Sequence, residues 1–244
     1  LRAWVISSVA LLSGAACVGP AVDPVVPPKT APVVEAIPVA AYPHDPDAFT
    51  QGLVFYNGRL YESTGLRGES TLRRVDLATG EVLQRVDLEP RYFAEGLAAL
   101  NGRLYQITWQ EDTGFVYDES TLERVQTFHY RGDGWGLTTD GTLLIRSNGT
   151  DVLYFHDPET FEVRYFKRVR DGESPVHSLN ELEWVEGEIW ANVWQQDQIA
   201  RIDPETGIVK VWVDLTALLP QIRFENEQAV ANGIAYDEAS GKLY

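Results

Sequence analysis

The stretch Phe49-Thr-Gln-Gly-Leu-Val-Phe-Tyr-Asn-Gly-Arg-Leu-Tyr61 returns almost unchanged as Phe93-Ala-Glu-Gly-Leu-Ala-Ala-Leu-Asn-Gly-Arg-Leu-Tyr105. In both copies an Asn-Gly dipeptide separates two apolar runs, which is a strong sequence signal for a β-hairpin. Looser copies surround Trp135, Asn180 and Asn232. The chain therefore holds five units that each open with a strand pair, and such repetition indicates a repeat fold.

A second motif follows four of these strand pairs. It is an Asp with a Thr three residues later, in Asp76-Leu-Ala-Thr79, Asp118-Glu-Ser-Thr121, Asp157-Pro-Glu-Thr160 and Asp203-Pro-Glu-Thr206. Asp at such a place, between two β-rich runs, is typical of a turn. Each unit thus holds a second hairpin, and four antiparallel strands repeated every ~40–50 residues are typical of a propeller blade.

We therefore expect an all-β fold over residues 33–244, a five-bladed β-propeller with four-stranded antiparallel blades. The fifth unit stops in its second strand, so we expect the last blade to be truncated at the C-terminus. The apolar stretch from Val33 to Ala41 is expected to supply an outer strand to that blade and to close the ring.

The N-terminal segment has the pattern of an export signal. Arg2 precedes an apolar stretch that ends in small residues before Cys17, which predicts a signal peptide over residues 1–17. The small residues resemble a lipoprotein box, so a lipid anchor at Cys17 and simple secretion both remain open. Residues 18–32 are rich in proline and are expected to form an extended linker. We expect a periplasmic or extracellular protein, touching a membrane only through that anchor.

Composition excludes several classes of function. The formal net charge is −16, which would repel a phosphate backbone, so no nucleic-acid partner is expected. The single cysteine permits neither an intramolecular disulfide nor a cysteine-based metal cluster, and the four histidines show no ligand spacing. We expect a monomer without metal or cofactor.

The register of the repeat places one residue of each unit at the same point of the innermost strand. These residues precede the Gly-Leu step or its counterpart, and they are Gln51, Glu95, Trp135, Asn180 and Asn232. Because the innermost strands line the central channel, the five side chains are expected to converge near the axis. Their polarity predicts a site; the alternative is a set of buried polar groups bonded to strand ends.

A second register position, seven residues after the hairpin glycine, adds Trp109 and Trp194 at the same rim and predicts an aromatic pocket around the axis. Glu95 is the one carboxyl in the ring, and apolar walls should raise its pKa, which suits a proton shuttle. Glu181 and Glu183 are expected to alternate on strand surfaces, and Asp133 to shape the turn before Trp135.

Seven motifs of the chain resemble those of the plant and bacterial glutamine cyclotransferases. They are Phe-Thr-Gln51-Gly-Leu, Phe-Ala-Glu95-Gly-Leu, Thr-Trp109, Gly-Trp135-Gly-Leu-Thr, Leu-Asn180-Glu-Leu-Glu-Trp, Ala-Asn-Val-Trp194 and Ala-Asn232-Gly-Ile-Ala-Tyr. The resemblance runs from about residue 33 to the end. It implies a five-bladed propeller that acts as a glutaminyl-peptide cyclotransferase, an aminoacyltransferase that converts N-terminal glutamine of a peptide to pyroglutamate and releases ammonia without a metal.

The resemblance also implies roles for individual residues. Glu95 would carry the proton from the α-amine to the departing ammonia, with Asn180 as the second catalytic group. Substrate would be held by a larger set, namely Phe49, Gln51, Trp109, Trp135, Trp194 and Asn232. The family's lysine, in a Thr-Gly-Lys run, falls just past Tyr244, so the site of this chain is expected to lack that group and its activity is in doubt.

Two other functions stay open. A non-catalytic exported propeller could use the same pocket to bind peptide N-termini or act as a scaffold, without turnover. A sugar-hydrolysing propeller would need a second carboxylate near Glu95, and the register supplies none at the axis.

Overall fold

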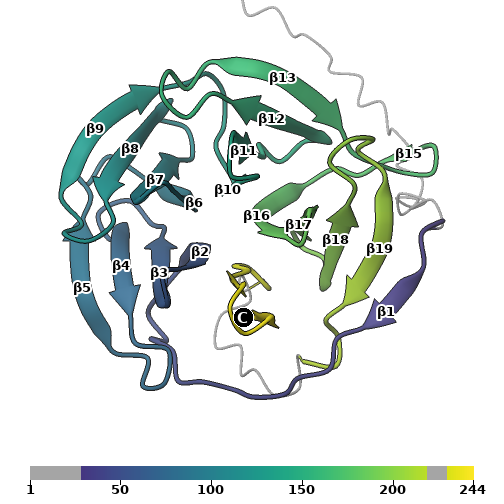
Figure 1. Ribbon diagram of the computed structural model, residues 1–244, viewed down its shortest axis with the longest axis horizontal. Coiled ribbons are helices and arrows are strands. Elements are labelled where there is room, and N and C mark those ends of the chain that lie inside the picture. The colour runs from purple at the N-terminus through teal and green to yellow at the C-terminus, as the bar shows by residue number, and fades with distance from the viewer. Residues whose placement is uncertain (1–28, 219–229) are drawn as a thin grey trace, which may run out of the picture.

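The computed structural model describes residues 29–218 and 230–244. The predicted signal peptide, most of the predicted linker and Cys17 lie outside these residues. The described residues form an all-β propeller with four-stranded antiparallel blades around a central axis (Figure 1). Among them, no helix has the length and apolar character needed to cross a membrane.

Four blades are complete, and the strands of each blade are given in order from the axis outward. The first contains β2 (Thr50–Tyr56), β3 (Arg59–Thr64), β4 (Thr71–Val75) and β5 (Val82–Asp87). The second contains β6 (Ala94–Leu100), β7 (Arg103–Thr108), β8 (Thr113–Asp118) and β9 (Arg124–His129). The third contains β10 (Leu137–Thr139), β11 (Leu144–Arg146), β12 (Val152–His156) and β13 (Val163–Arg168). The fourth contains β16 (Leu179–Val185), β17 (Glu188–Val193), β18 (Gln198–Ile202) and β19 (Val209–Asp214).

The Asp-x-x-Thr motifs form the turn between the third and fourth strands of every blade, as predicted. In the first blade the Thr79 backbone N–H and hydroxyl both donate to Asp76 Oδ1, at 2.8 and 2.9 Å. Gly80 N donates to the Asp76 carbonyl at 2.8 Å, and the other three turns repeat this bond at the same length. The Asp side chain thus accepts hydrogen bonds from N–H groups of the turn that have no backbone acceptor, which is why Asp recurs at this position.

The cores lie between neighbouring blades. The interface of the first and second blades buries a cluster of aromatic and aliphatic side chains, including Tyr61, Leu72, Leu97, Leu104, Phe115 and Tyr117. The outer strand β5 alternates between half-buried and exposed residues, because only one of its faces meets a neighbour. The axial strand β6 is buried along its whole length, since blades enclose it on both sides.

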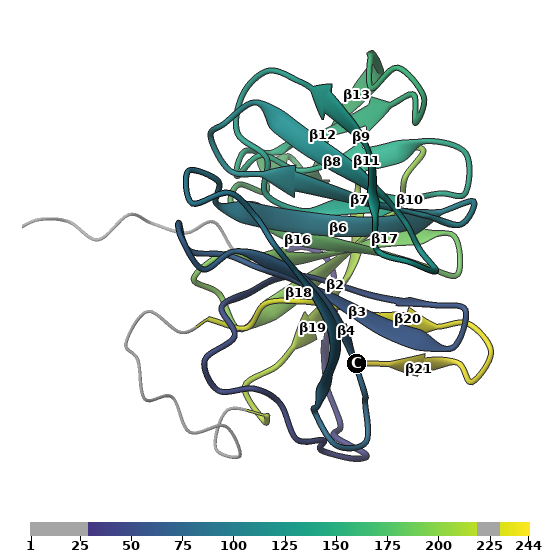
Figure 2. The ribbon, with the colours of Figure 1, turned by 90° about the vertical axis from the view of Figure 1, so that its left-hand side faces the viewer.

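The chain after residue 229 forms a small fifth sheet rather than a full blade. It contains β20 (Tyr236–Asp237) and β21 (Lys242–Leu243), which pair antiparallel. The hairpin lies near the centre, between the innermost strands of the first and fourth blades (Figures 1 and 2). Ile234 packs against the fourth blade, and Ala235 and Tyr244 pack against the first. The described residues thus show four blades and two two-stranded sheets, of which this one lies near the axis.

The expected role of the segment after Val33 is wrong. It was expected to complete the last blade, but β1 (Val33–Glu35) pairs parallel with β19, the outer strand of the fourth blade. Asp171, in the short hairpin of β14 (Arg170–Asp171) and β15 (Ser174–Pro175), fixes the segment there by accepting bonds from the backbone N–H groups of Thr30 and Ala31. The physical reason is that β19 offers an unpaired edge, whereas the described residues give β20–β21 no third strand for an outer strand to join.

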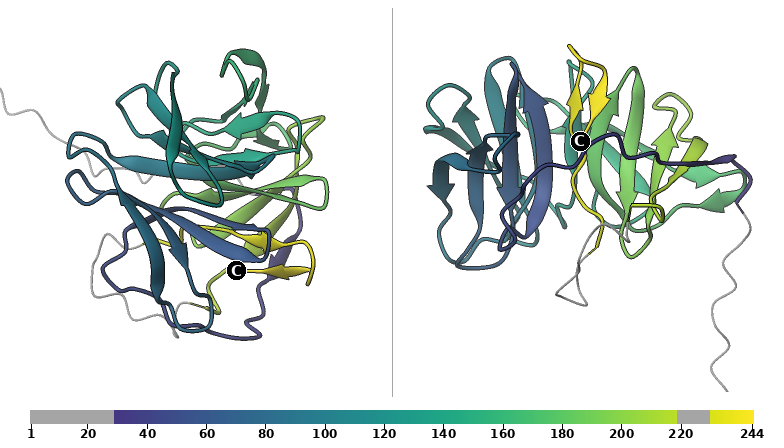
Figure 3. Two further views of the ribbon diagram at one scale, coloured as in Figure 1. Left: turned by 60° about the vertical axis from the view of Figure 1, so that its left-hand side comes forward. Right: turned by 90° about the horizontal axis from the view of Figure 1, so that it is seen from below.

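Residues 36–49 then cross to the first blade, along the lower edge of the ring in Figure 1 and in the view from below in Figure 3. Two ion pairs fix the far end of this strap, which is defined here as residues 30–49. Asp45 pairs with Arg73 at 2.7 Å, and His44 pairs with Glu62 at 2.8 Å. The strap therefore connects the first blade to the fourth across the part of the ring that holds only the small β20–β21 sheet.

Candidate active site

Three of the predicted axial residues lie at irregularities of their strands. Between Thr50 and Gly52, between Ala94 and Leu97, and between Leu179 and Leu182, the axial strand has one residue more than its partner. The extra residues include Gln51, Glu95 and Asn180. A bulge of this kind bends the strand and redirects a side chain that regular pairing would place on a sheet face. The bulges therefore explain how these side chains turn toward the axis.

The axial strands of the first three blades pack closely through the glycine that follows each site residue. A Cβ on Gly52 would lie 2.6 Å from the Leu97 backbone nitrogen, and one on Gly96 would lie 2.3 Å from that of Leu137. A Cβ on Gly136 would lie 2.1 Å from the Asn180 carbonyl oxygen. These are backbone atoms of the next blade, so only glycine permits the approach.

Three predicted amides form one hydrogen-bonded chain. Asn180 Nδ2 donates to Asn232 Oδ1 at 3.1 Å, and Asn232 Nδ2 donates to Gln51 Oε1 at 2.7 Å. Asn232 Nδ2 also donates to the Thr50 carbonyl at 3.0 Å. Residues far apart in the sequence are thus joined into an amide network from the first and fourth blades and the C-terminal segment.

Glu95 has a different environment from the amides. Its side chain is buried, and no hydrogen bond to its carboxyl group is found among residues 29–218 and 230–244. Burial, and then the charges of Glu111 and Asp133, raise the pKa of Glu95 well above its ordinary value of 4.5. A carboxyl group with a raised pKa can hold a proton near neutral pH and return it, which is what a general acid–base group must do.

Aromatic rings form two groups at this end of the axis. Phe93 packs edge-on against Phe49 and Trp109, with ring centroids 6.1 and 5.6 Å apart. Trp135 packs edge-on against Trp194 at 5.8 Å. The four aromatic residues that were predicted are therefore brought into two clusters, and Phe93 joins them as a residue that the sequence analysis did not single out. The sequence does indicate Phe93, because it precedes Glu95 by two positions, just as Phe49 precedes Gln51.

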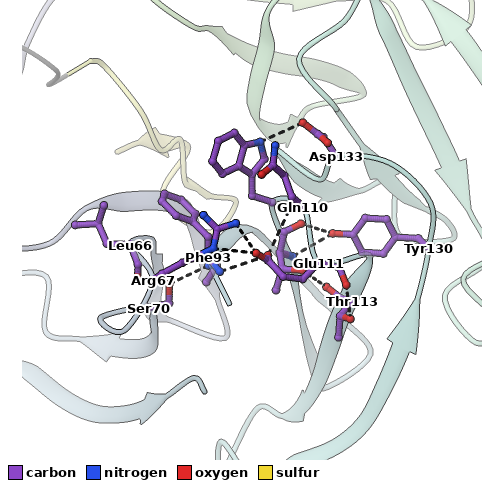
Figure 4. Close-up of polar contacts among 12 residues, drawn as sticks. Leu66, Arg67, Ser70, Phe93, Gln110, Glu111, Thr113, Tyr130 and Asp133 are labelled. Atoms are coloured by element: carbon purple, nitrogen blue, oxygen red, sulfur yellow. Dashed lines mark hydrogen bonds and ion pairs between the residues drawn. The ribbon is translucent and has the colours of Figure 1, made fainter. Parts of the chain in front are cut away.

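Polar residues fix the rings of the first cluster in place (Figure 4). Trp109 Nε1 donates to Asp133 Oδ2 at 3.2 Å, so Asp133 orients the indole as well as preceding Trp135. Glu111 Oε2 accepts a bond from the Phe93 backbone N–H at 3.4 Å, and Glu111 Oε1 pairs with Arg67 at 2.6 Å. The acidic groups that raise the pKa of Glu95 thus also position the aromatic wall.

The family model described as glutamine cyclotransferase matches residues 9–244. A glutaminyl-peptide cyclotransferase from Arabidopsis thaliana is 47% identical over 210 residues, which are 84% of this chain and 66% of that relative. The crystal structure of Myxococcus xanthus glutaminyl cyclase superimposes with a TM-score of 0.79 at 40% identity, over 83% of this chain and 87% of that one. The chain belongs to the glutamine cyclotransferase family.

One expectation about the acidic residues near the site is wrong. Glu181 and Glu183 do not alternate on strand surfaces: both are buried, 0% and 6% exposed, and accept bonds from backbone N–H groups of the C-terminal segment. Trp194, which was expected at the rim, packs on Trp135 and is 43% exposed. The periodicity of a strand could not show that Glu181 and Glu183 are buried, because their burial depends on what the neighbouring segment presents.

The indole N–H of Trp135 is an unused hydrogen-bond donor among the described residues. Its Nε1 atom is buried and has no hydrogen-bond partner in the described part of the chain. A buried N–H without a partner is costly, on the order of 1–3 kcal/mol, and such groups in native proteins are often functional. Among the described residues no group of three or more His, Cys, Asp and Glu side chains is arranged to hold a metal ion.

Proposed function

We propose that this chain converts the N-terminal glutamine of peptides to pyroglutamate with release of ammonia, as a glutaminyl-peptide cyclotransferase. Membership of the family supports this, although the chain spans 66% of the length of its Arabidopsis relative. The observation that carries the proposal is Glu95, a buried carboxyl with a raised pKa at the same bulge position of its axial strand as Gln51 and Asn180 of the amide network. Peptides with N-terminal glutamine are thus the proposed partners, with no nucleic acid and no metal.

The proposed reaction is an intramolecular acyl transfer. The substrate's α-amine attacks the carbonyl carbon of its own side-chain amide, and a C–N bond forms while negative charge develops on the amide oxygen. Glu95 accepts the proton that the amine loses and then donates it to the departing nitrogen, which leaves as ammonia. Atoms and charge balance without a metal or a second substrate.

The amide network and the indoles would supply orientation. Asn180 and Gln51 offer both donors and acceptors to the substrate's amine and amide, and Asn232 fixes their relative positions. Trp135 Nε1, which is buried and has no partner among the described residues, would donate to a carbonyl oxygen of the bound peptide. Phe49, Trp109 and Trp194 would then enclose the glutamine side chain against water.

We also propose that the small fifth sheet stands in the place of a fifth blade. Support comes from the axial contacts, which run from each blade to the next. A Cβ on Gly233, which follows Asn232, would lie 3.3 Å from Leu53 Cβ and 3.2 Å from Thr50 Cγ2, both on the first blade. Gly233 therefore faces the first blade as Gly52, Gly96 and Gly136 face the next blade, although its neighbours are side-chain atoms and lie farther away.

We also propose that the segment before residue 18 directs export of the protein, and that the protein is a monomer. An export signal would place the enzyme where peptide N-termini are accessible, in the periplasm or outside the cell, with or without a lipid on Cys17. Intact-mass measurement of the protein recovered from its native cell distinguishes the two cases, because a lipid adds a defined mass to the N-terminal cysteine.

The experiment that tests the reaction uses the complete product of the gene. A peptide that begins with glutamine is incubated with the protein, and mass spectrometry follows the loss of ammonia. We expect turnover that a chelator leaves unchanged, and a fall of about 10²–10⁴-fold in Glu95→Gln. Glu183→Gln is the matched control, because it alters an equally buried carboxyl on another strand.

Each other outcome has a definite meaning. Binding of the peptide without ammonia release would favour the non-catalytic propeller. Full turnover by Glu95→Gln would exclude its role as proton carrier, and inhibition by a chelator would exclude the metal-free reaction.

A further inference from the structure

Unit four differs from the others at one position of the axial strand. The residue after the site residue is Gly52, Gly96, Gly136 and Gly233 in the other four units, but it is Glu181 here. In the first three blades that glycine permits backbone contact with the next axial strand. Unit four instead carries a long carboxylate side chain, completely buried, at the point where the neighbour is the C-terminal segment.

The Glu181 carboxylate bonds to two other axial segments at once. Its Oε2 accepts the backbone N–H of Ile234 at 2.9 Å, and its Oε1 accepts that of Leu53 at 3.3 Å. Leu53 lies on β2 of the first blade, whereas Ile234 lies in the segment that leads to β20. One side chain therefore joins three axial segments that share no backbone hydrogen bond at this point.

Both of these partners lie two residues after a member of the amide network. Leu53 follows Gln51, and Ile234 follows Asn232, while Glu181 itself follows Asn180. The carboxylate thus fixes the three backbone segments whose side chains form the Asn180–Asn232–Gln51 chain. The separation of those segments sets the lengths of the bonds at 3.1 and 2.7 Å.

We propose that Glu181 is a positioning residue, which sets the spacing of the amide network by holding the axial segments of the first blade, the fourth blade and the C-terminal hairpin together. The inference rests on the proposed function, since the network it positions is the proposed substrate cradle. Glu181 acts through its neighbours and does not itself reach the substrate.

The chemistry requires a carboxyl group here. Two backbone N–H groups need two acceptors, and both carboxyl oxygens can accept. An amide has one acceptor oxygen, and its NH₂ group would face an N–H donor. Glutamine at position 181 therefore keeps the size and shape of the side chain but must release one of the two segments.

The chain supplies a matched control in Glu183, two residues along the same strand. Glu183 is also buried, and its Oε1 accepts the Tyr236 backbone N–H at 2.8 Å, which again joins the fourth blade to the C-terminal hairpin. Its second contact is the Thr138 hydroxyl, at 3.4 Å, and not the strand that carries Gln51. Glu183→Gln thus makes the same chemical change without touching the amide network.

The test compares Glu181→Gln and Glu183→Gln in the complete gene product, at a temperature where both are folded. In Glu181→Gln we expect kcat/KM for a glutamine-initiated peptide to fall by at least about tenfold, because misplacement by about 1 Å can cost up to ~10²-fold. In Glu183→Gln it should stay within about twofold, because the network is intact. If Glu181→Gln does not fold, Glu181→Asp takes its place. Equal kcat/KM values, or equal losses, in the two variants would overturn the proposal.

A second measurement does not need turnover. The side-chain amide NMR signals of Asn180, Asn232 and Gln51 should move in the position-181 variant and stay in place in Glu183→Gln. Signals that do not move in either variant would refute the positioning role. If the wild-type protein shows no turnover, the proposed function fails, while the NMR comparison still decides the role of Glu181.

Discussion

Replacing Gly96 with alanine should separate the second and third blades at the axis. The new Cβ would lie 2.3 Å from the Leu137 backbone nitrogen and 2.5 Å from the Gly136 carbonyl carbon. Ordinary contact begins at 3.4 Å, so the strands must move apart by about 1 Å. The bond from Gly96 N to the Trp135 carbonyl, now 2.7 Å, would then be lost.

The cost of this change has two parts. Overpacking of a close-packed interior costs about 1–3 kcal/mol, and a buried N–H left without a partner costs about 1–3 kcal/mol. The sum is about 2–6 kcal/mol, which for a domain of this size lowers the melting temperature by at least about 4 °C. Thermal unfolding followed by circular dichroism measures it.

Gly102→Ala is the control for Gly96→Ala. Gly102 lies in the hairpin between β6 and β7 with a φ of 73°, and a Cβ there would meet nothing within 4 Å. Alanine at position 102 therefore adds only the cost of a left-handed backbone, about 1–2 kcal/mol. The argument for close axial packing would be refuted if Gly96→Ala melted no lower than Gly102→Ala.

Three further results are expected. The turnover rate should rise as the pH passes the raised pKa of Glu95. Glu111→Gln should move this rise to lower pH, because it removes a negative charge that raises the pKa of Glu95. Both effects can be measured in pH–rate profiles. The hydrogen bond to Glu62 raises the pKa of His44, so this pair should stabilise the fold below about pH 6.5 and cease to do so as pH rises through the raised value. Since His44 is half exposed, the effect on melting temperature should correspond to no more than about 1 kcal/mol, and His44→Ala should abolish it. Burial raises the pKa of Asp171, but the hydrogen bonds that its carboxylate accepts have the larger total effect and lower this pKa. The stabilisation that Asp171 provides should therefore disappear only in acid. In urea unfolding at neutral pH, Asp171→Asn should lower the free energy of unfolding by about 1.5–3 kcal/mol.

The sequence by itself determined the blades. Asn-Gly hairpins and Asp-x-x-Thr turns are local chemistry, and their repetition identified the four strands of each complete blade between Thr50 and Asp214, but not the β14–β15 hairpin. The ring of axial residues followed from register alone, because equivalent positions of a repeat occupy equivalent places in space. Three of these five residues, Gln51, Asn180 and Asn232, are joined by hydrogen bonds in the structure.

Only the tertiary structure decided which partners the buried polar groups and edge strands would find. The segment at Val33 pairs with whichever edge is free, and that edge belongs to β19. Glu181 resembles a surface residue of an alternating strand until the Ile234 and Leu53 N–H groups lie opposite it. These contacts join residues more than 50 positions apart, and no local pattern records them, because hydrogen-bond partners across blades depend on how the ring closes.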